Sequence, residues 1–535
     1  MHVPACGDGC SPQWCAVRLA LEWPEPVNAI QRMKPTVVFQ DRTLEPERFF
    51  ERYQRGASAL RALGIGDGDV VALMMRNGPT VLEAMLAVRW LGAYWCPVNW
   101  HFKADEVRHI LADSGAKLFI CDADLLQSLG DVAPAGVQVL PAIPPSGEMP
   151  ADSSGPAAST WDALRDAASH DAGPATQRPR GAMLYTSGTT GRPKGIRRQP
   201  STPEQAVLAL EKLRQIIGLD DGMRALLCAP IYHSAPNSFA MGAAQKDAYI
   251  VIEPRFDAEH TLRLIEQHRI THAYLVPTMY VRLLRLPDEV KRKYDLSSMK
   301  FVSSTGSPCP PDVKRAMIEW WGPVIHEAYG SSELGYMTRL DSHDALRKPG
   351  SAGRPLAGVQ IRILGEDGRE LPQGQAGLIY VHQSTLTDFT YNDNDAARRS
   401  MERDGYLTMG DVGYLDEDGF LFIVDRSADM VISGGVNIYP AEIEAVLQAM
   451  PGVEDCAVFG IPDPEFGEGL AAAVQPRAGA SLTGEEVKAW LKARLAGYKV
   501  PSVVAFHDAL PREDTGKIFK RRLREPYWAG ANRRI

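Results

Sequence analysis

The sequence predicts an α/β protein: a large N-terminal portion of two doubly wound α/β subdomains and a small β subdomain, followed by a small α+β C-terminal domain. Its 535 residues exceed the length of one ordinary domain, so at least two domains are expected. Helix and strand patterns alternate through two long blocks, as in parallel α/β layers. After these blocks, strand–turn–strand patterns with Asp-Gly turns indicate antiparallel structure.

The first alternating block runs from Lys34 to Asn99 as strand, amphipathic helix, strand "VVALMM", helix and strand. This order implies a crossover unit of a parallel sheet. After "AKLFICDADLL", residues 132–182 are rich in Pro, Ala, Ser and Gly. Such a composition is typical of a surface connection, and we expect one here.

The second block continues the alternation after this connection. Helices are expected at 203–218, 258–270 and 311–321, and strands at 248–254, 272–277, 300–306 and 324–330. Antiparallel strands are then expected in 358–382 and 413–426, each of which contains an Asp-Gly turn. The remaining segments, from 441 onward, alternate helix and strand at a smaller scale, which predicts a separate compact domain.

Composition and charge exclude several classes of protein. The chain is 45% apolar and 23% charged, as in soluble globular proteins, and its net charge of -8 disfavours a non-specific nucleic-acid binder. No run of 18 apolar residues occurs, and the N-terminus lacks the layout of a signal peptide, so neither a transmembrane segment nor secretion is indicated.

The cysteines suit a reducing compartment, which makes the cytoplasm the default location. Five of the eight are scattered singly: Cys96, Cys121, Cys228, Cys309 and Cys456. The other three lie together in an N-terminal extension: Cys6, Cys10 and Cys15. Their spacing fits no standard ligand pattern, so an irregular extension is favoured over the alternative of a metal or cluster site.

The stretch "LYTSGTTGRPKGIRR", residues 184–198, combines glycines, hydroxyl side chains and a lysine. Glycine backbone N–H groups, hydroxyl donors and a positive charge are the parts from which proteins build a cradle for polyphosphate. The stretch is not a Walker loop, because Pro193 precedes Lys194 and Gly195 follows it. The alternative interpretation is a glycine turn with a solvated lysine.

Within this stretch, "TSGTTGRPKG" resembles at every position the phosphate loop of the adenylate-forming superfamily, which includes acyl-CoA synthetases, firefly luciferase and nonribosomal peptide adenylation domains. A match over ten positions is improbable by chance. The resemblance implies that the loop binds the phosphates of ATP. The implied residues are Thr186, Ser187, Gly188, Thr189, Thr190, Gly191 and Lys194.

Three further segments resemble the adenylate site of the same superfamily, in the expected order: "STGSP" from 304, "YGSSE" from 329 and "GDVGYLDEDGFLFIVDR" from 410. The resemblance implies that Tyr329 packs at the adenine, that Ser332 holds the α-phosphate, and that Glu333 binds Mg²⁺, which prefers oxygen ligands. It implies that Asp411 receives the ribose hydroxyls. The full implied set is Gly306, Ser307, Pro308, Tyr329, Gly330, Ser331, Ser332, Asp411 and Arg426.

The C-terminal part is similar to the family's mobile lid domain. "ISGGVNIYPAEIE" implies that Gly434 and Gly435 line the path of the thiol, and "LPREDTGKIFKRR" implies that Lys517 is the catalytic lysine. The hinge position carries Ala428 where most relatives have Lys or Asp, which puts the balance between the two half-reactions in doubt. The resemblance places a large AMP-binding domain at 34–425 and the small lid domain at 426–535, after an extension at 1–33.

The stretch "APIYHSAPNSFAMGAA", residues 229–244, decides the branch of the superfamily. It offers no acid to pair with a substrate amine, and "YHSAP" looks like the acyl-CoA synthetase version, with His233 as a catalytic ring at the mouth of the thiol tunnel. The alternative is a buried structural histidine. Asn237 to Ala244 would wall the acid pocket with mostly small, apolar side chains, which favours a hydrophobic acid.

The expected function is that of an ATP-dependent acid–CoA ligase. It would convert a fatty, aryl or alicyclic acid to acyl-AMP with release of pyrophosphate, then transfer the acyl group to coenzyme A. ATP, Mg²⁺ and coenzyme A are the expected cofactors and co-substrates, and a small-molecule carboxylic acid is the expected partner, with a homodimer left open. Two alternatives stay open: a member that keeps one half-reaction, and a non-catalytic protein that binds acyl-adenylate or coenzyme A.

Overall fold

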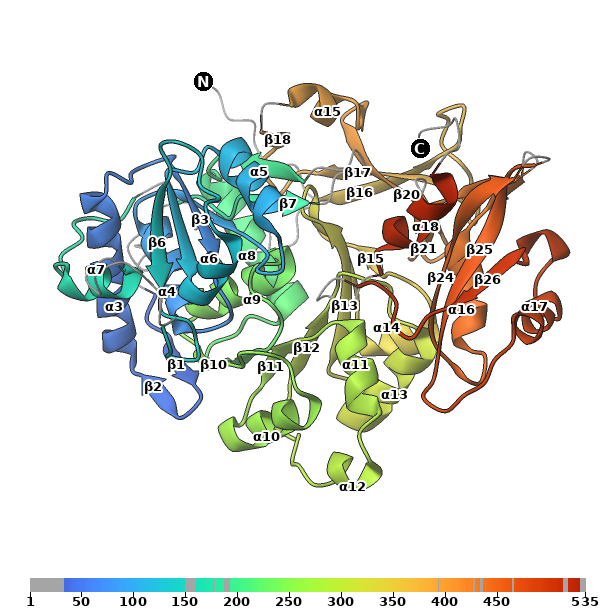
Figure 1. The fold of residues 1–535 in the computed structure, drawn as a ribbon, viewed down its shortest axis with the longest axis horizontal. Helices are drawn as coiled ribbons and strands as arrows, with labels where there is room; N and C mark the ends of the chain where they lie inside the picture. Colours follow the sequence, from blue (N-terminus) through green and yellow to red (C-terminus); the bar gives the residue numbers. More distant parts are fainter. Residues whose placement is uncertain are drawn as a thin grey trace, which may run out of the picture.

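Figure 1 shows a computed structural model in which the large N-terminal part occupies the left and centre and the C-terminal domain lies at the right. The structure describes residues 33–149, 160–176, 179–186, 193–392, 394–426, 429–433, 436–463, 466–512 and 518–529. Within these ranges, no helix has both the length and the apolar character needed to cross a bilayer. The cysteines Cys6, Cys10 and Cys15 lie outside the described residues.

A four-stranded parallel sheet forms the first layer, with the order β4-β3-β5-β6. Its strands are β3 (Val70–Met74), β4 (Tyr94–Pro97), β5 (Leu118–Asp122) and β6 (Gln138–Ala142). The helices along this part of the chain are α3 (Pro46–Ala62), α4 (Pro79–Trp90), α5 (Ala104–Ser114), α6 (Ala123–Leu129) and α7 (Trp161–Ala167). Every residue of β3, β4 and β5 is buried, as expected for parallel strands covered on both faces.

A nine-stranded sheet forms the second layer, with the order β15-β14-β13-β12-β11-β9-β10-β1-β2. Its strands are β1 (Thr36–Phe39), β2 (Arg42–Leu44), β9 (Arg224–Leu227), β10 (Tyr249–Ile252), β11 (His272–Tyr274), β12 (Phe301–Ser304), β13 (Ile325–Ser331), β14 (Gly335–Leu340) and β15 (Arg354–Pro355). Its helices are α8 (Pro203–Ile217), α9 (Ser234–Gln245), α10 (Ala258–His268), α11 (Pro277–Leu284), α12 (Asp288–Lys291), α13 (Pro311–Trp321) and α14 (Ser342–Arg347). The predicted alternation of the second block is confirmed.

The first predicted strand does not belong to the first sheet. β1 pairs in parallel with β10, with Thr36 opposite Tyr249, so it joins the second sheet across more than 200 residues of chain. Hydrophobic periodicity identifies a strand but carries no information about its partner, which explains why the sequence assigned β1 to the wrong block.

Antiparallel structure follows, as predicted. One sheet contains β16 (Val359–Leu364), β17 (Gly377–Gln383), β19 (Glu402–Arg403), β20 (Tyr406–Leu415) and β21 (Leu421–Arg426). A three-stranded sheet contains β7 (Leu184–Thr186), β8 (Lys194–Arg198) and β18 (Phe389–Tyr391), with α15 (Asp395–Arg399) after it. The small sheet therefore brings the two arms of the predicted phosphate loop beside a strand that follows about 200 residues later.

The C-terminal domain is a five-stranded sheet with helices. It contains β22 (Val431–Ser433), β23 (Val436–Ile438), α16 (Pro440–Gln448), β24 (Val453–Asp463), β25 (Gly467–Pro476), α17 (Gly484–Lys492), a 3₁₀ turn (Gly497–Lys499), β26 (Val503–Phe506) and α18 (Lys520–Trp528). Its sheet and helices form a separate apolar core that includes Ile443 of α16, Val458 of β24 and Leu491 of α17. The predicted compact α+β domain is confirmed.

The prediction of a surface connection at 132–182 is wrong for two parts of that segment. β6 is the edge strand of the first sheet, and α7 places the fully buried Trp161 ring against Gly56 of α3. A Cβ atom on Gly56 would lie 3.2 Å from that ring. The Pro, Ala and Ser content of the segment hid both elements, because composition averages over short structured stretches.

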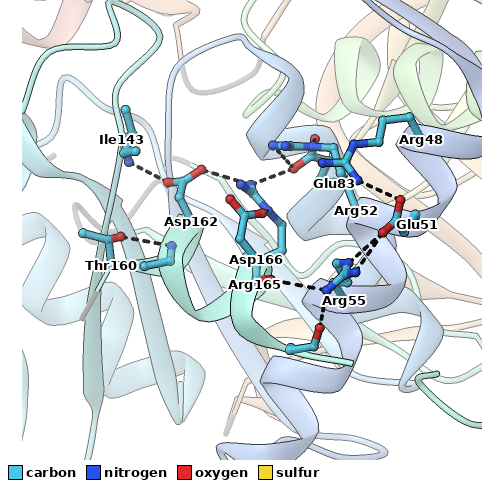
Figure 2. Close-up of polar contacts among 12 residues, drawn as sticks. Arg48, Glu51, Arg52, Arg55, Glu83, Ile143, Thr160, Asp162, Arg165 and Asp166 are labelled. Carbon is cyan, nitrogen blue, oxygen red and sulfur yellow. Dashed lines mark hydrogen bonds and ion pairs between the residues drawn. The ribbon is translucent and has the colours of Figure 1, made fainter. Parts of the chain in front are cut away.

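An ion-pair network joins α7 to the first layer, as Figure 2 shows. The buried Arg165 guanidinium lies 3.0 Å from Glu83 of α4 and 3.0 Å from Asp162, and Glu83 also pairs with Arg52 of α3. The second oxygen of Asp162 accepts the backbone N–H of Ile143, just after β6, at 2.8 Å. The network therefore connects the end of β6 with three helices.

We predict that Glu83→Ala lowers the free energy of unfolding by about 3 kcal/mol, because it leaves Arg165 buried with one carboxylate partner fewer. Glu51 provides the control, since it pairs with Arg48 and Arg55 at the edge of the same network and is partly exposed. Glu51→Ala should cost about 1 kcal/mol or less. Urea denaturation monitored by tryptophan fluorescence measures both, and equal losses in the two variants would contradict the prediction.

Candidate active site

The described residues include the whole predicted adenylate set but only the two ends of the phosphate loop. Thr186 is the last residue of β7 and Lys194 the first of β8, and they face each other in the antiparallel ladder. Nine predicted site residues lie outside the described residues: Ser187, Gly188, Thr189, Thr190, Gly191, Ala428, Gly434, Gly435 and Lys517.

Glu333 lies in the turn between β13 and β14, and only 5% of its surface is exposed. Two hydroxyl groups donate to its carboxylate: Thr186 Oγ1 at 3.1 Å and Tyr391 OH at 3.2 Å. The Lys194 ammonium lies over the Tyr391 ring, 5.4 Å from its centroid. The structure thus brings together the predicted residues Thr186, Lys194 and Glu333, which come from β7, β8 and the β13–β14 turn. Tyr391 of β18 lies between them.

Tyr391 is a site residue that the sequence did not predict. Burial and the charge of Glu333 raise the pKa of its phenol, so it stays protonated and keeps donating to the carboxylate. Its segment, "DFTY", predicts at most a short strand. No local signal indicates that this hydroxyl meets a carboxylate 58 residues earlier in the chain.

Arg198 is a second residue that the sequence did not predict. It stands at the end of β8, and its guanidinium donates to the backbone oxygens of Ser332, at 3.1 Å, and Glu333. Burial lowers its pKa to about 10, which leaves it charged at neutral pH. The strand that follows the phosphate loop therefore also holds the backbone of the Glu333 turn.

The predicted ribose carboxylate, Asp411, is buried on β20 and engaged by two of its predicted neighbours. Tyr329 OH donates to one oxygen, and Arg426 Nε lies 3.4 Å from the other. Arg426 is the residue opposite Asp411 in the β20–β21 ladder. Burial and the charge of Asp411 raise the pKa of Tyr329 well above its ordinary value.

The predicted "STGSP" strip follows the carboxyl end of β12, beside β13. Gly306 has a φ of +98°, a conformation that favours glycine, and a Cβ atom there would meet no atom within 4 Å. Gly306 and Pro308 are exposed, and Ser307 is partly exposed. The open edge at the carboxyl ends of neighbouring parallel strands is where open α/β sheets bind ligands.

His233 is the N-cap residue just before α9 (Ser234–Gln245), and the centroid of its ring lies 4.2 Å from that of Tyr232. Tyr232 in turn contacts Trp100, with ring centroids 4.7 Å apart. Nε2 of His233 is buried, and no hydrogen-bond partner for it exists among the described residues. Burial, and then the nearby His101, lower the pKa of His233 to about 4, so the ring is neutral at neutral pH.

The stretch predicted to wall the acid pocket is buried along α9. Asn237 is satisfied internally, since it accepts from Trp95 Nε1 at 3.3 Å and donates to the Ile231 oxygen at 3.1 Å. Gly242 allows close packing on α8, because a Cβ atom there would lie 2.8 Å from Ile217. From Asn237 to Ala244, this helix presents no charged side chain.

Comparisons with known proteins agree with this geometry. Residues 27–388 match the family described as AMP-binding enzyme, and residues 442–517 match the AMP-binding enzyme C-terminal domain. The chain is 35% identical over 481 residues to a feruloyl-CoA synthase of an Amycolatopsis species, covering 89% of this chain and 92% of the relative. It is 33% identical to an indoleacetate–CoA ligase of Aromatoleum aromaticum, covering 94% and 97%. The solved structure of ATP-bound MatB from Rhodopseudomonas palustris superposes with a TM-score of 0.81 at 30% identity, covering 94% and 99%.

The buried His233 generates a prediction about stability. The pKa of His233 is about 4 in the folded protein and 6.5 in the unfolded chain, so the unfolded chain takes up a proton first as the pH falls. The neutral ring of His233 therefore contributes its full stabilisation above pH 6.5, and this contribution is lost as the pH falls toward 4. The urea midpoint of the wild type should therefore drop further from pH 7.5 to pH 4.5 than that of His233→Phe. The exposed His343 is the control, and His343→Phe should keep the wild-type drop. Identical drops in wild type and His233→Phe would contradict the prediction.

Proposed function

Because this chain belongs to the family of AMP-binding enzymes and is an AMP-forming acid–CoA ligase, we propose that its substrate is a hydrophobic acid with an aryl or comparably bulky carbon skeleton. One observation carries this substrate class: α9, which would wall the pocket, offers mostly small and apolar side chains and no charge from Asn237 to Ala244. Two relatives, 35% and 33% identical to this chain, are named for ferulate and indoleacetate, which are both aromatic acids.

The reaction has two steps. A carboxylate is a poor electrophile, so its oxygen first attacks the α-phosphorus of ATP, forming acyl-AMP and expelling pyrophosphate. The thiol of coenzyme A then attacks the acyl carbon, and AMP leaves with the electron pair of the broken C–O bond. The first step depends on positioning and on neutralising phosphate charge, which is the role proposed for Lys194, the glycine loop and Lys517.

Mg²⁺ fits the residues present. Glu333 is a buried carboxylate with hydroxyl partners. A Mg²⁺ ion bound to ATP takes most of its oxygen ligands from phosphate and water, so one protein carboxylate is enough to hold it. Among the described residues, no group of three or more His, Cys, Asp or Glu side chains could hold a metal by itself. When bound with ATP, the ion would supply charge neutralisation at the phosphates.

The remaining residue roles are proposals of the same kind. Asp411 would receive the ribose hydroxyls, with Tyr329 at the adenine. His233 would close the mouth of the acid pocket, which the unpartnered, buried Nε2 supports, because a purely structural buried histidine normally has its hydrogen bonds satisfied. The small domain would rotate about Ala428 between the two steps. The free, buried thiols of the five described cysteines support a reducing compartment, and we propose the cytoplasm.

We predict that incubation with ATP, Mg²⁺, coenzyme A and a panel of acids yields acyl-CoA and AMP from hydrophobic acids. Cinnamic acids, indoleacetate and palmitate test the hydrophobic class, and acetate and malonate are the small and charged controls. Mass spectrometry identifies the products. An acyl-CoA formed from malonate or acetate but from none of the hydrophobic acids, or formed from palmitate but from neither aryl acid, would contradict the proposed substrate class.

We predict that Lys517→Ala slows formation of acyl-AMP by at least about 100-fold, since it removes a charge that acts on the phosphates in the transition state. Transfer of supplied acyl-AMP to coenzyme A should change little. Arg521→Ala is the control, because Arg521 is exposed on the following helix, and both half-reactions should keep wild-type rates. Pyrophosphate exchange measures the first step and thioester formation the second; wild-type adenylation by Lys517→Ala would refute the assigned role.

A further inference from the structure

The backbone of the turn that carries Glu333 is held by side chains from outside the turn. Arg198 donates to the carbonyl oxygens of Ser332 and Glu333, as described above. In addition, Gln383 Nε2 donates to the oxygens of Leu334, at 2.6 Å, and Tyr336, at 3.1 Å. Four carbonyl groups of residues 332–336 are therefore satisfied by two side chains, which leaves the turn little freedom.

Lys212 determines which way the Gln383 amide faces. The Lys212 ammonium, on α8, donates to Gln383 Oε1 and to Thr385 Oγ1, and Thr385 Oγ1 donates to the same Gln383 oxygen at 2.9 Å. An ammonium has donors only, so the amide must present its oxygen to Lys212. The amide nitrogen is thereby turned toward the carbonyl groups of Leu334 and Tyr336.

The turn also has features of its own that fix its conformation. Ser331 Oγ accepts the N–H of Leu334 at 2.9 Å, and Gly335 adopts a φ of +64°, where a Cβ atom would lie 3.1 Å from Leu386.

No carboxylate among the described residues pairs with Lys212, and burial lowers its pKa to about 8. A half-buried ammonium without a counter-charge is costly, which marks Lys212 as more than a solvated surface lysine.

We propose that Lys212 and Gln383 are positioning residues that hold the turn 332–336, and with it the Glu333 carboxylate, for a divalent cation bound to ATP. Lys212 acts through Gln383, and Gln383 acts through the backbone of the turn; neither needs to touch the nucleotide. Side chains that orient a metal ligand in this way commonly affect metal affinity about 10-fold when removed. The inference rests on the proposed role of Glu333.

The test measures binding of a fluorescent ATP analogue with excess Mg²⁺ and, separately, with EDTA. Lys212→Met and Gln383→Leu should each raise the Kd in Mg²⁺ about tenfold and leave the Kd in EDTA unchanged. The double variant should resemble Gln383→Leu alone, because the two side chains act in series. Arg214→Met is the matched control: Arg214 lies on the same helix, is exposed and pairs with Glu211 at 3.7 Å, so its loss should change neither Kd.

Two conservative variants separate positioning from loss of structure. Lys212→Arg keeps the donors and should restore the wild-type Kd, whereas Gln383→Glu keeps the size but loses the amide donor and should behave like Gln383→Leu. Thermal melting confirms that each variant is folded. Three results would overturn the inference: wild-type Kd in Lys212→Met, equal losses with and without Mg²⁺, or additive effects in the double variant.

The readout also separates this inference from the proposed function. Binding of Mg²⁺ and the ATP analogue requires neither the acid nor coenzyme A. A wild type that binds them but forms no acyl-CoA from any acid would count against the proposed substrate and leave the comparison of Kd values standing. A wild type that binds no ATP analogue in Mg²⁺ would overturn both.

Discussion

The burial of one carboxylate, Glu333, is the constraint on which the site depends. An ionised carboxylate removed from water is costly unless it is hydrogen-bonded or paired. Here Thr186, at the end of β7 before the phosphate loop, and Tyr391 of β18 supply the hydrogen bonds. Satisfying this one group therefore forces three distant parts of the chain, separated by 58 and 147 residues, into a single corner of the structure.

The two polar networks of the large domain are built differently. In the first layer, Arg165 is surrounded by the carboxylates of Glu83, Asp162 and Asp166, so its charge is matched within the protein. Around Glu333, the side chains that hold the backbone, Arg198 and Gln383, donate to neutral carbonyl groups; among the described residues Arg198 forms no direct ion pair, and the charges of Glu333 and Asp388 act on it only through space. The first arrangement suits a structural connection between helices. The second suits a surface that must accept a highly charged anion.

Much of the fold followed from the sequence, because helix and strand periodicity is local: the second block, the antiparallel strands and the C-terminal domain were predicted closely. The failures concern partners and buried contacts. Nothing in the period of β1 identifies β10 as its neighbour, and the composition around Trp161 concealed a core helix. At the candidate site, glycine-rich and acidic motifs predicted Thr186, Glu333 and Asp411. Tyr391, Arg198, Lys212 and Gln383 carry no motif, and their contacts with these residues become visible only when the chain is folded.

The pairing of Asp411 with Arg426 has a mechanical consequence. The two residues face each other on the last rungs of the β20–β21 ladder, and Arg426 ends β21 two residues before the proposed hinge. When a domain rotates about a hinge, the atoms nearest the hinge move least. A nucleotide bound at Asp411 would therefore lie beside the rotation axis, and rotation of the C-terminal domain would change the contacts of the ribose little. The adenylate could then stay bound while the groups that the C-terminal domain presents to it are exchanged.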